Sequence, residues 1–226
     1  MGSKLTKRVF GVVIVTISIA LLGGFGLSAS AQTLLSSTGL TTKGVRSQAT
    51  NLGDFIADTM RSAAKSDAAV IAASSFTDVT LPEGTVSASD VLSALEFRGD
   101  NVVVMKLTGQ ELRRALEHGF ALYPQPNSAF LQISGISMVV DPKAAKGHHV
   151  VSVTIDGAPL DPSQSYTIAM PSPLANGALG YFKVWSPSEI VTAKDPKKTI
   201  EQCVTSYFTS HKTLDVQAAN PIITRK

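Results

Sequence analysis

The feature of this sequence that most limits its fold is an alternation of short apolar strand patterns with amphipathic helix patterns. A helix is predicted to begin at Asn51, which is placed to cap it, and apolar residues recur along one of its faces. Residues 68–72 form an apolar run of strand length. Residues 101–107 predict a second strand, after which Thr108–Glu111 forms a capping box that opens a helix through about His118. This order predicts an α/β fold.

Strand patterns dominate the second half of the chain. Residues 149–155 alternate in polarity and run into Asp156–Gly157, a dipeptide typical of a hairpin turn. We therefore expect Ser165–Met170 to return as the partner strand of that hairpin. The other predicted elements are a short helix capped by Ser87 or Ser89, strands at 130–133 and 136–140, and a last helix at about 198–210.

The N-terminus has the organisation of a secretory signal peptide over residues 1–31. Three basic residues precede the apolar run Val9–Leu22, and Ala29–Ala31 supplies the small-x-small pattern that signal peptidase accepts. Retention as a membrane anchor is the alternative, but a span needs about 18 to 20 apolar residues, which requires counting the run through Leu27. We expect cleavage, and hence export to the periplasm or the cell exterior with no stable membrane anchor.

The remainder is predicted to hold one folded domain. Residues 32–45 are rich in Ser, Thr and Gly and are predicted to be a linker, which leaves residues 46–226 as the domain. Cleavage would remove three of the 20 basic residues and none of the 17 acidic residues, so the mature chain would carry no formal net charge. The basic pI of the whole chain therefore gives no support for a nucleic-acid partner.

The sequence predicts neither a disulfide nor a metal site. Cys203 is the only cysteine and lies on an apolar helical stripe, so we expect a buried packing thiol. His148 and His149 are neighbours on a predicted strand and would point to opposite faces, which makes them a poor chelating pair. We expect no metal and no other cofactor.

Several segments resemble, in order and spacing, the C-terminal domain of the 5'-nucleotidase family. The resemblance covers roughly residues 40–215 and implies a layered α/β (α+β) fold with mixed sheets and helices. The segments that carry it are Arg46 with Asn51–Asp58, Leu95–Phe97, Asn101–Val104, Leu107–Gly109, Phe130–Gly135 and Gly177–Tyr181.

The family's chemistry belongs to a separate N-terminal metallophosphatase domain. There, two metal ions clamp the phosphoryl group that is transferred. The signatures of that domain are Asp-x-His, Gly-Asn-His-Asp/Glu and Gly-His-x-His, and none of them occurs in the 226 residues. We therefore assign no catalytic residue and expect no phosphoester hydrolysis by this chain alone.

The family's C-terminal domain contributes a nucleoside clamp, in which two aromatic rings sandwich the base and arginines hold the sugar-phosphate side. The resemblance implies that Arg46 matches one arginine, Phe97 the first stacking phenylalanine and Asn101 the asparagine that follows it. The insertion Arg98–Asp100 lengthens the gap between the last two. These three residues are the candidate contacts to a nucleoside or nucleotide.

Three other expected contacts are replaced. Thr77 stands where the family has an arginine, Pro173 where it has the second stacking phenylalanine, and Leu179 where it has an aspartate. Each lost hydrogen bond to a charged group costs about 1.5 to 3 kcal/mol. Such a site would bind a nucleotide orders of magnitude more weakly.

The aromatic residues near these positions leave room for another interpretation. Phe76, Tyr181, Phe182 and Trp185 are candidates to line a different, more apolar pocket. We expect Phe76 and Trp185 to be core side chains instead.

Three functional hypotheses follow. The chain is a binding module with degenerate nucleotide contacts, or the substrate-binding subunit of a split 5'-nucleotidase that acts with a separate metallophosphatase chain. The third hypothesis is a structural or protein-interaction domain with no small ligand. The ligand affinity of the Phe97 region distinguishes the first two from the third.

Overall fold

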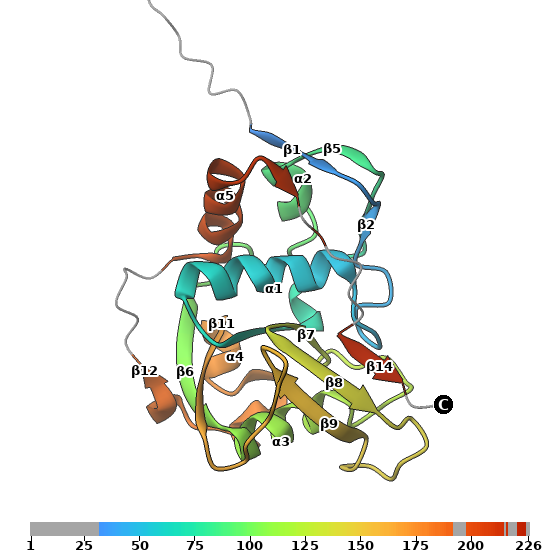
Figure 1. Cartoon of the computed structure of the whole chain (residues 1–226), viewed down its shortest axis with the longest axis vertical. Helices are drawn as coiled ribbons and strands as arrows, with labels where there is room; N and C mark the ends of the chain where they lie inside the picture. Colours follow the sequence, from blue (N-terminus) through green and yellow to red (C-terminus); the bar gives the residue numbers. More distant parts are fainter. Residues whose placement is uncertain (1–31, 192–197, 215, 217–220, 225–226) are drawn as a thin grey trace, which may run out of the picture. The chain divides into compact units, whose positions relative to one another are not determined.

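A five-stranded mixed sheet carries the fold (Figure 1). The computed structural model describes residues 32–191, 198–214, 216 and 221–224, so the predicted signal peptide lies outside the described residues. Two neighbouring strands inside the sheet are parallel, and the other pairings are antiparallel. In spatial order the strands are β12 (Ile190–Val191), β6 (Val102–Thr108), β11 (Ser165–Pro171), β3 (Ala68–Ala72) and β7 (Leu131–Ser134).

Helices cover both faces of this sheet. α1 packs on one face, against β3 and β7, whereas α3 and α4 pack on the other, against β6 and β11 (Figure 1). The mixed sheet between helices confirms the predicted α/β fold. The helices are α1 (Asn51–Ala64), α2 (Ala88–Leu92), α3 (Gly109–Gly119), α4 (Ser172–Ala175) and α5 (Ile200–Ser210), with 3-10 turns η1 (Ala73–Ser75), η2 (Ala178–Lys183) and η3 (Pro187–Glu189).

Side-chain caps fix where the helices begin. At α3 the Thr108 hydroxyl accepts from the Glu111 N–H at 3.2 Å, and the Glu111 carboxylate accepts from the Thr108 N–H at 2.8 Å. This reciprocal pair confirms the predicted capping box, which satisfies N–H groups that have no partner inside the helix. Ser87 and Asp90 form the same arrangement at α2.

Asn51 does not cap α1, contrary to the prediction. The cap is Thr50, and Asn51 is the first helical residue. The Asn51 side chain instead accepts from the Thr41 N–H at 2.9 Å and donates to the Gly39 carbonyl at 2.8 Å. It therefore ties the start of α1 to the segment that precedes it.

A second sheet has the order β10-β9-β8-β14. Asp156 and Gly157 turn the chain with φ of 47° and 81°, which matches the left-handed conformation of a two-residue hairpin turn. The partner of this hairpin is β10, however, and not Ser165–Met170, which lies in β11 between β3 and β6 of the first sheet. The strands are β8 (Ile136–Val140), β9 (Val150–Ile155), β10 (Ala158–Pro159) and β14 (Ile222–Thr224).

The segment predicted to be a linker, residues 32–45, is folded. Its side chains Leu34 and Leu40 are 2% and 0% exposed, because they pack into the core that the following residues form. Its strands complete two small sheets, β13-β1-β5 and β2-β4. The strands are β1 (Thr33–Ser36), β2 (Leu40–Thr41), β4 (Thr80–Leu81), β5 (Gly84–Ser87) and β13 (Thr213–Leu214).

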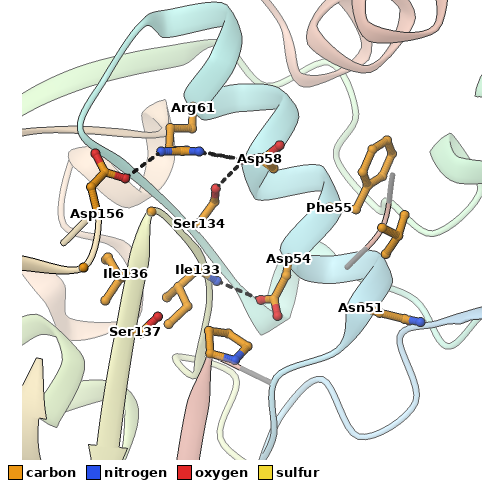
Figure 2. A pocket seen from close by; sticks show the side chains of 14 residues that line it. Asn51, Asp54, Phe55, Asp58, Arg61, Ile133, Ser134, Ile136, Ser137 and Asp156 are labelled. Atoms are coloured by element: carbon orange, nitrogen blue, oxygen red, sulfur yellow. Dashed lines mark hydrogen bonds and ion pairs between the residues drawn. The ribbon is translucent and has the colours of Figure 1, made fainter. Parts of the chain in front are cut away.

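Side-chain hydrogen bonds connect α1 to β7. The Ser134 hydroxyl donates to Asp58 at 2.7 Å, and the Ile133 N–H donates to Asp54 at 3.1 Å (Figure 2). Because both acceptors lie on α1, the helix is held to the strand by polar contacts as well as by packing.

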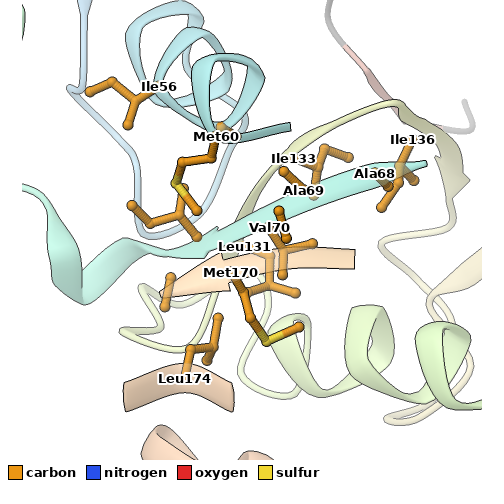
Figure 3. Close-up of a cluster of buried hydrophobic side chains, with 14 of the residues drawn as sticks. Ile56, Met60, Ala68, Ala69, Val70, Leu131, Ile133, Ile136, Met170 and Leu174 are labelled. Atoms are coloured by element: carbon orange, nitrogen blue, oxygen red, sulfur yellow. The ribbon is translucent and has the colours of Figure 1, made fainter. Parts of the chain in front are cut away.

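The core lies on both sides of the five-stranded sheet. Ile56 and Met60 project from α1 onto one side, and Met170 and Leu174 lie on the other (Figure 3). Cys203 is 2% exposed, and burial raises the pKa of its thiol to about 11, as expected of a packing residue. Within the described residues, no helix is long and apolar enough to cross a membrane, and no three His, Cys, Asp or Glu side chains could together hold a metal ion.

Candidate functional site

The topology brings several loops to one edge of the five-stranded sheet. Because β3 and β11 run parallel, their carboxyl ends meet at the same edge. β6 and β7 run in the opposite direction and begin there, since Val102 pairs with Pro171 and Leu131 pairs with Ala72. The carboxyl ends of parallel strands are a common location of ligand sites in α/β folds.

Arg46 is bound to this edge through the loop that precedes β7. Its Nη1 donates to the Ser128 hydroxyl at 2.6 Å, and its carbonyl accepts from the Asn127 N–H at 2.8 Å. The Ser128 carbonyl in turn accepts from the Ser74 N–H at 3.1 Å, just after β3. The guanidinium is thus exposed but anchored.

Gln132 holds the segment around Arg46 in place. It is 0% exposed, and its amide nitrogen donates to the carbonyls of Val45 at 3.1 Å and Gln48 at 2.9 Å. Its amide oxygen accepts from the N–H of Thr50 at 2.7 Å and from the Thr50 hydroxyl at 2.8 Å. This role was not predicted from the sequence, where the available signal was a polar residue inside an apolar strand pattern.

Phe97 presents its ring to solvent. The side chain is 54% exposed and stacks on no other ring within the described residues. Its loop is fixed by the backbone alone, because the Glu96 N–H donates to the Ser75 carbonyl at 2.9 Å and the Asp100 N–H donates to the Phe97 carbonyl at 3.1 Å. An exposed, positioned ring of this kind can stack on a planar ligand.

Asn101 lies next to the loop after β11. Its carbonyl accepts from the Ser172 N–H at 2.8 Å, and its exposed side chain makes no hydrogen bond within the described part of the chain. The neighbouring Pro173 is also exposed, in the first turn of α4. Partial burial raises the pKa of Asp100, which belongs to the insertion between Phe97 and Asn101.

Thr77 is bound to the residues that follow α2. Its hydroxyl donates to the Ser93 carbonyl at 3.1 Å, and its N–H donates to the Ala94 carbonyl at 3.0 Å. The side chain is therefore engaged with the end of α2 and offers no charge to the edge.

Leu179 has an unusual backbone. Its φ is 57° and its ψ is 23°, in the left-handed region that favours Gly, Asn and Asp. The His118 Nε2 contacts its carbonyl oxygen at 2.8 Å, which fixes the loop over the end of α3. The side chain is 39% exposed. The loop thus keeps a conformation that suits aspartate better than leucine.

Most of the nearby aromatic residues belong to the core. Tyr181 and Trp185 are 0% and 4% exposed and stack with ring centroids 4.6 Å apart, and Phe76 is 5% exposed. The Tyr181 hydroxyl donates to the Ala129 carbonyl at 2.7 Å, and burial raises the pKa of that phenol. The prediction that Phe76 and Trp185 are core residues is confirmed. Phe182, 67% exposed, is the exception.

Comparison with known proteins assigns the fold to a family. The sequence profile of the 5'-nucleotidase C-terminal domain matches residues 27–185. The chain belongs to the 5'-nucleotidase C-terminal domain family. This membership agrees with the order of the segments from Asn51 to Tyr181.

Similar proteins are nucleotide phosphoesterases of greater length. The chain is 31% identical over 178 residues to a 5'-nucleotidase of Vibrio parahaemolyticus, with 78% of this chain and 30% of the relative covered. It is 32% identical over 145 residues to the trifunctional nucleotide phosphoesterase YfkN of Bacillus subtilis, with 61% of this chain but 10% of YfkN covered. The chain therefore spans less than a third of the length of either relative.

Solved structures share the fold. The 5'-nucleotidase precursor of Thermus thermophilus superposes with a TM-score of 0.71 at 24% identity, over 84% of this chain and 39% of that protein. The NAD nucleotidase of Haemophilus influenzae superposes with a TM-score of 0.65 at 20% identity, over 78% of this chain and 33% of that protein. In this 5'-nucleotidase C-terminal domain, Arg46, Phe97, Asn101 and Pro173 all lie on segments that meet at one sheet edge, with Leu179 on the loop after α4.

The backbone at Leu179 leads to a stability prediction. We expect Leu179→Asn to raise the free energy of unfolding by about 1 kcal/mol, because asparagine tolerates the left-handed conformation that leucine resists. Urea denaturation measures the change. Leu122→Asn is the matched control, since Leu122 is 52% exposed and has no positive φ, and it should not stabilise. Equal effects of the two substitutions would contradict the interpretation.

Proposed function

We propose that this chain is an exported binding module of the 5'-nucleotidase C-terminal class, with degenerate nucleotide contacts and no phosphoester chemistry of its own. The exposed ring of Phe97 carries the proposal, because a solvated phenylalanine held by backbone hydrogen bonds is suited to stack on a base. Arg46 and Asn101 lie on segments that reach the same sheet edge and have exposed side chains. A nucleoside or nucleotide is therefore the proposed ligand, and it is bound weakly.

Three replaced family contacts explain why we expect this binding to be weak. The Thr77 hydroxyl already donates to a backbone carbonyl, and neither Pro173 nor Leu179 offers an aromatic ring or a charge. A base would stack on one ring instead of between two, and stacking contributes about 1 to 3 kcal/mol per base.

Restoring the expected contacts tests this proposal. We expect the triple variant Thr77→Arg, Pro173→Phe and Leu179→Asp to bind AMP at least about a hundredfold more tightly than the wild-type chain, since each regained charged hydrogen bond contributes about 1.5 to 3 kcal/mol. The left-handed backbone at position 179 accepts an aspartate without rearrangement. Calorimetric titration with adenosine, AMP and UDP-glucose measures the affinities.

The control is Phe97→Ala in both backgrounds. It should abolish the binding that the triple variant gains, and it should remove whatever affinity the wild-type chain has. If the triple variant gains nothing, or if Phe97→Ala leaves its affinity unchanged, this edge is not a nucleotide site and the structural or interaction hypothesis replaces it.

A split 5'-nucleotidase is the second candidate. Phe97, Leu179 and Phe182 are exposed apolar side chains on the loops at or near this edge, and a partner domain would remove them from water. The proposed partner is a separate metallophosphatase chain, which would supply the metal-assisted hydrolysis. Adding this chain to a separately expressed metallophosphatase domain of the family should then increase phosphate release from AMP. If this chain binds AMP but does not increase phosphate release, the split-enzyme hypothesis is rejected and the binding-module hypothesis remains.

A further inference from the structure

A cavity of about 340 Å³ lies at the opposite end of β7 from the candidate nucleotide contacts. It is bounded by α1, by the connection from β7 to β8 and by the turn between β9 and β10 (Figure 2). Its volume is within the range of small-molecule sites, roughly 300 to 1,000 Å³. Nothing in the proposed function uses this cavity.

Two of the carboxylates in the cavity are paired. Arg61 lies between Asp58 and Asp156, with a nitrogen 3.3 Å from an oxygen of each (Figure 2). Asp58 also accepts from the Ser134 hydroxyl at 2.7 Å. The one guanidinium of the cavity is therefore already matched by two carboxylates.

Asp54 is the carboxylate that remains without a cation. One of its oxygens accepts from the Ile133 N–H at 3.1 Å, and the other has no hydrogen bond within the described residues. The side chain points into the cavity in Figure 2. Because Asp54 is partly exposed at the cavity wall, its free oxygen is accessible to a donor from a bound ligand.

The rest of the wall is mixed, with the polar side chains of Asn51, Ser134 and Ser137 beside an apolar part. Phe55, Ile133 and Ile136 line it together with Val216 and Pro221. Among the described residues no three His, Cys, Asp or Glu side chains converge as metal ligands, so a bare metal ion does not fit the arrangement. A cationic head with an apolar body matches both parts of the wall.

We propose that this cavity binds a small organic amine, whose ammonium group donates to the free oxygen of Asp54 while its apolar body packs on Phe55 and Ile136. The bond is a charge-assisted hydrogen bond between an ammonium and a carboxylate. The acceptor and the apolar wall together select against anions, which face three carboxylates and one arginine.

The pH dependence of binding follows from Asp54. Burial raises the pKa of this carboxyl to about 7, and the hydrogen bond from Ile133 opposes the rise. The other charged groups that face the cavity are Asp58 and Arg61 from α1 and Asp156 from the β9–β10 turn, while β7 and β8 contribute no titratable side chain. Since the amine binds the ionised carboxylate, its affinity should rise about tenfold between pH 6 and pH 8.

Titration of the 15N-labelled chain with 2-phenylethylamine, followed by NMR, tests the proposal. Saturable shifts are expected at the amides of Ile133 and Ser134, with at least tenfold weaker binding of the neutral isostere 2-phenylethanol. The tenfold gain from pH 6 to pH 8 provides a second readout on the wild-type chain, which requires no variant to fold. Equal binding of amine and alcohol, or an affinity that does not change with pH, would overturn the proposal.

Two variants locate the site. Asp54→Asn keeps an acceptor for the Ile133 N–H but removes the charge, so the amine affinity should fall at least tenfold. Phe97→Ala, at the other end of β7, should leave the amine affinity unchanged. If the amine binds Asp54→Asn as tightly as the wild-type chain, or if Phe97→Ala abolishes binding, the ligand occupies a different place.

Discussion

Gln132→Leu should lower the free energy of unfolding by about 4 kcal/mol. The substitution keeps the size of the side chain but leaves the Thr50 N–H and the carbonyls of Val45 and Gln48 without their partner, at about 1 to 3 kcal/mol for each buried group. Urea denaturation monitored by circular dichroism measures the loss. The effect is large because one buried amide serves three backbone groups from a segment more than 80 residues earlier in the chain.

Gln110→Leu is the matched control. Gln110 is exposed in the first turn of α3, so its replacement should change the free energy of unfolding by less than about 0.5 kcal/mol. The Gln132 variant should also weaken any ligand contact of Arg46, which lies between Val45 and Gln48. A loss below about 1 kcal/mol for Gln132→Leu would mean that water or a rearranged loop satisfies the freed groups.

Asp54→Asn should stabilise the protein above neutral pH, by an amount on the order of 3 kcal/mol. The folded state raises the pKa of Asp54 from 3.8 to about 7, so between these values it binds a proton that the unfolded state has released. Stability contributed by such a group is greatest below pH 3.8 and falls as the pH rises to about 7. Asparagine has no such dependence and still accepts from the Ile133 N–H.

Denaturation curves at pH 4 and pH 8 measure the difference. At pH 4 the variant and the wild-type chain should agree within about 0.5 kcal/mol, and at pH 8 the variant should be more stable. Asp58→Asn is the control, because Asp58 is paired with Arg61 at a partly exposed position and its loss should be neutral or slightly destabilising at both pH values. An Asp54→Asn variant that is less stable at pH 8 would show that the carboxylate is paired in solution.

Local signals in the sequence were reliable because their causes are local. The capping box at Thr108 and Glu111 needs only four consecutive residues, and the buried strand 68–72 needs only an apolar run of the right length. The hairpin turn at Asp156 and Gly157 was also correct, but its partner was not. Which strands β11 joins depends on residues 57 to 100 positions away, and no local pattern encodes that choice.

The linker prediction failed for a related reason. Residues 32–45 have the composition of a flexible segment, but their side chains Leu34, Leu40 and Val45 pack into the core of the domain. The resemblance to the family was sufficient to predict which residues are candidate nucleotide contacts. Their exposure, the engagement of the Thr77 hydroxyl and the backbone of Leu179 required the tertiary structure, as did the role of Gln132.

The hydrogen bond between Asp54 and β7 has a consequence for association between molecules. β7 is an outermost strand of the five-stranded sheet, and the outward N–H of Ile133 would otherwise be open to a strand from another chain. A carboxylate from α1 occupies that donor and places a charge beside it, which opposes edge-to-edge pairing and the aggregation that follows from it. We therefore expect Asp54 to lower the stability of the single molecule at neutral pH while it blocks one hydrogen-bond donor of the sheet edge.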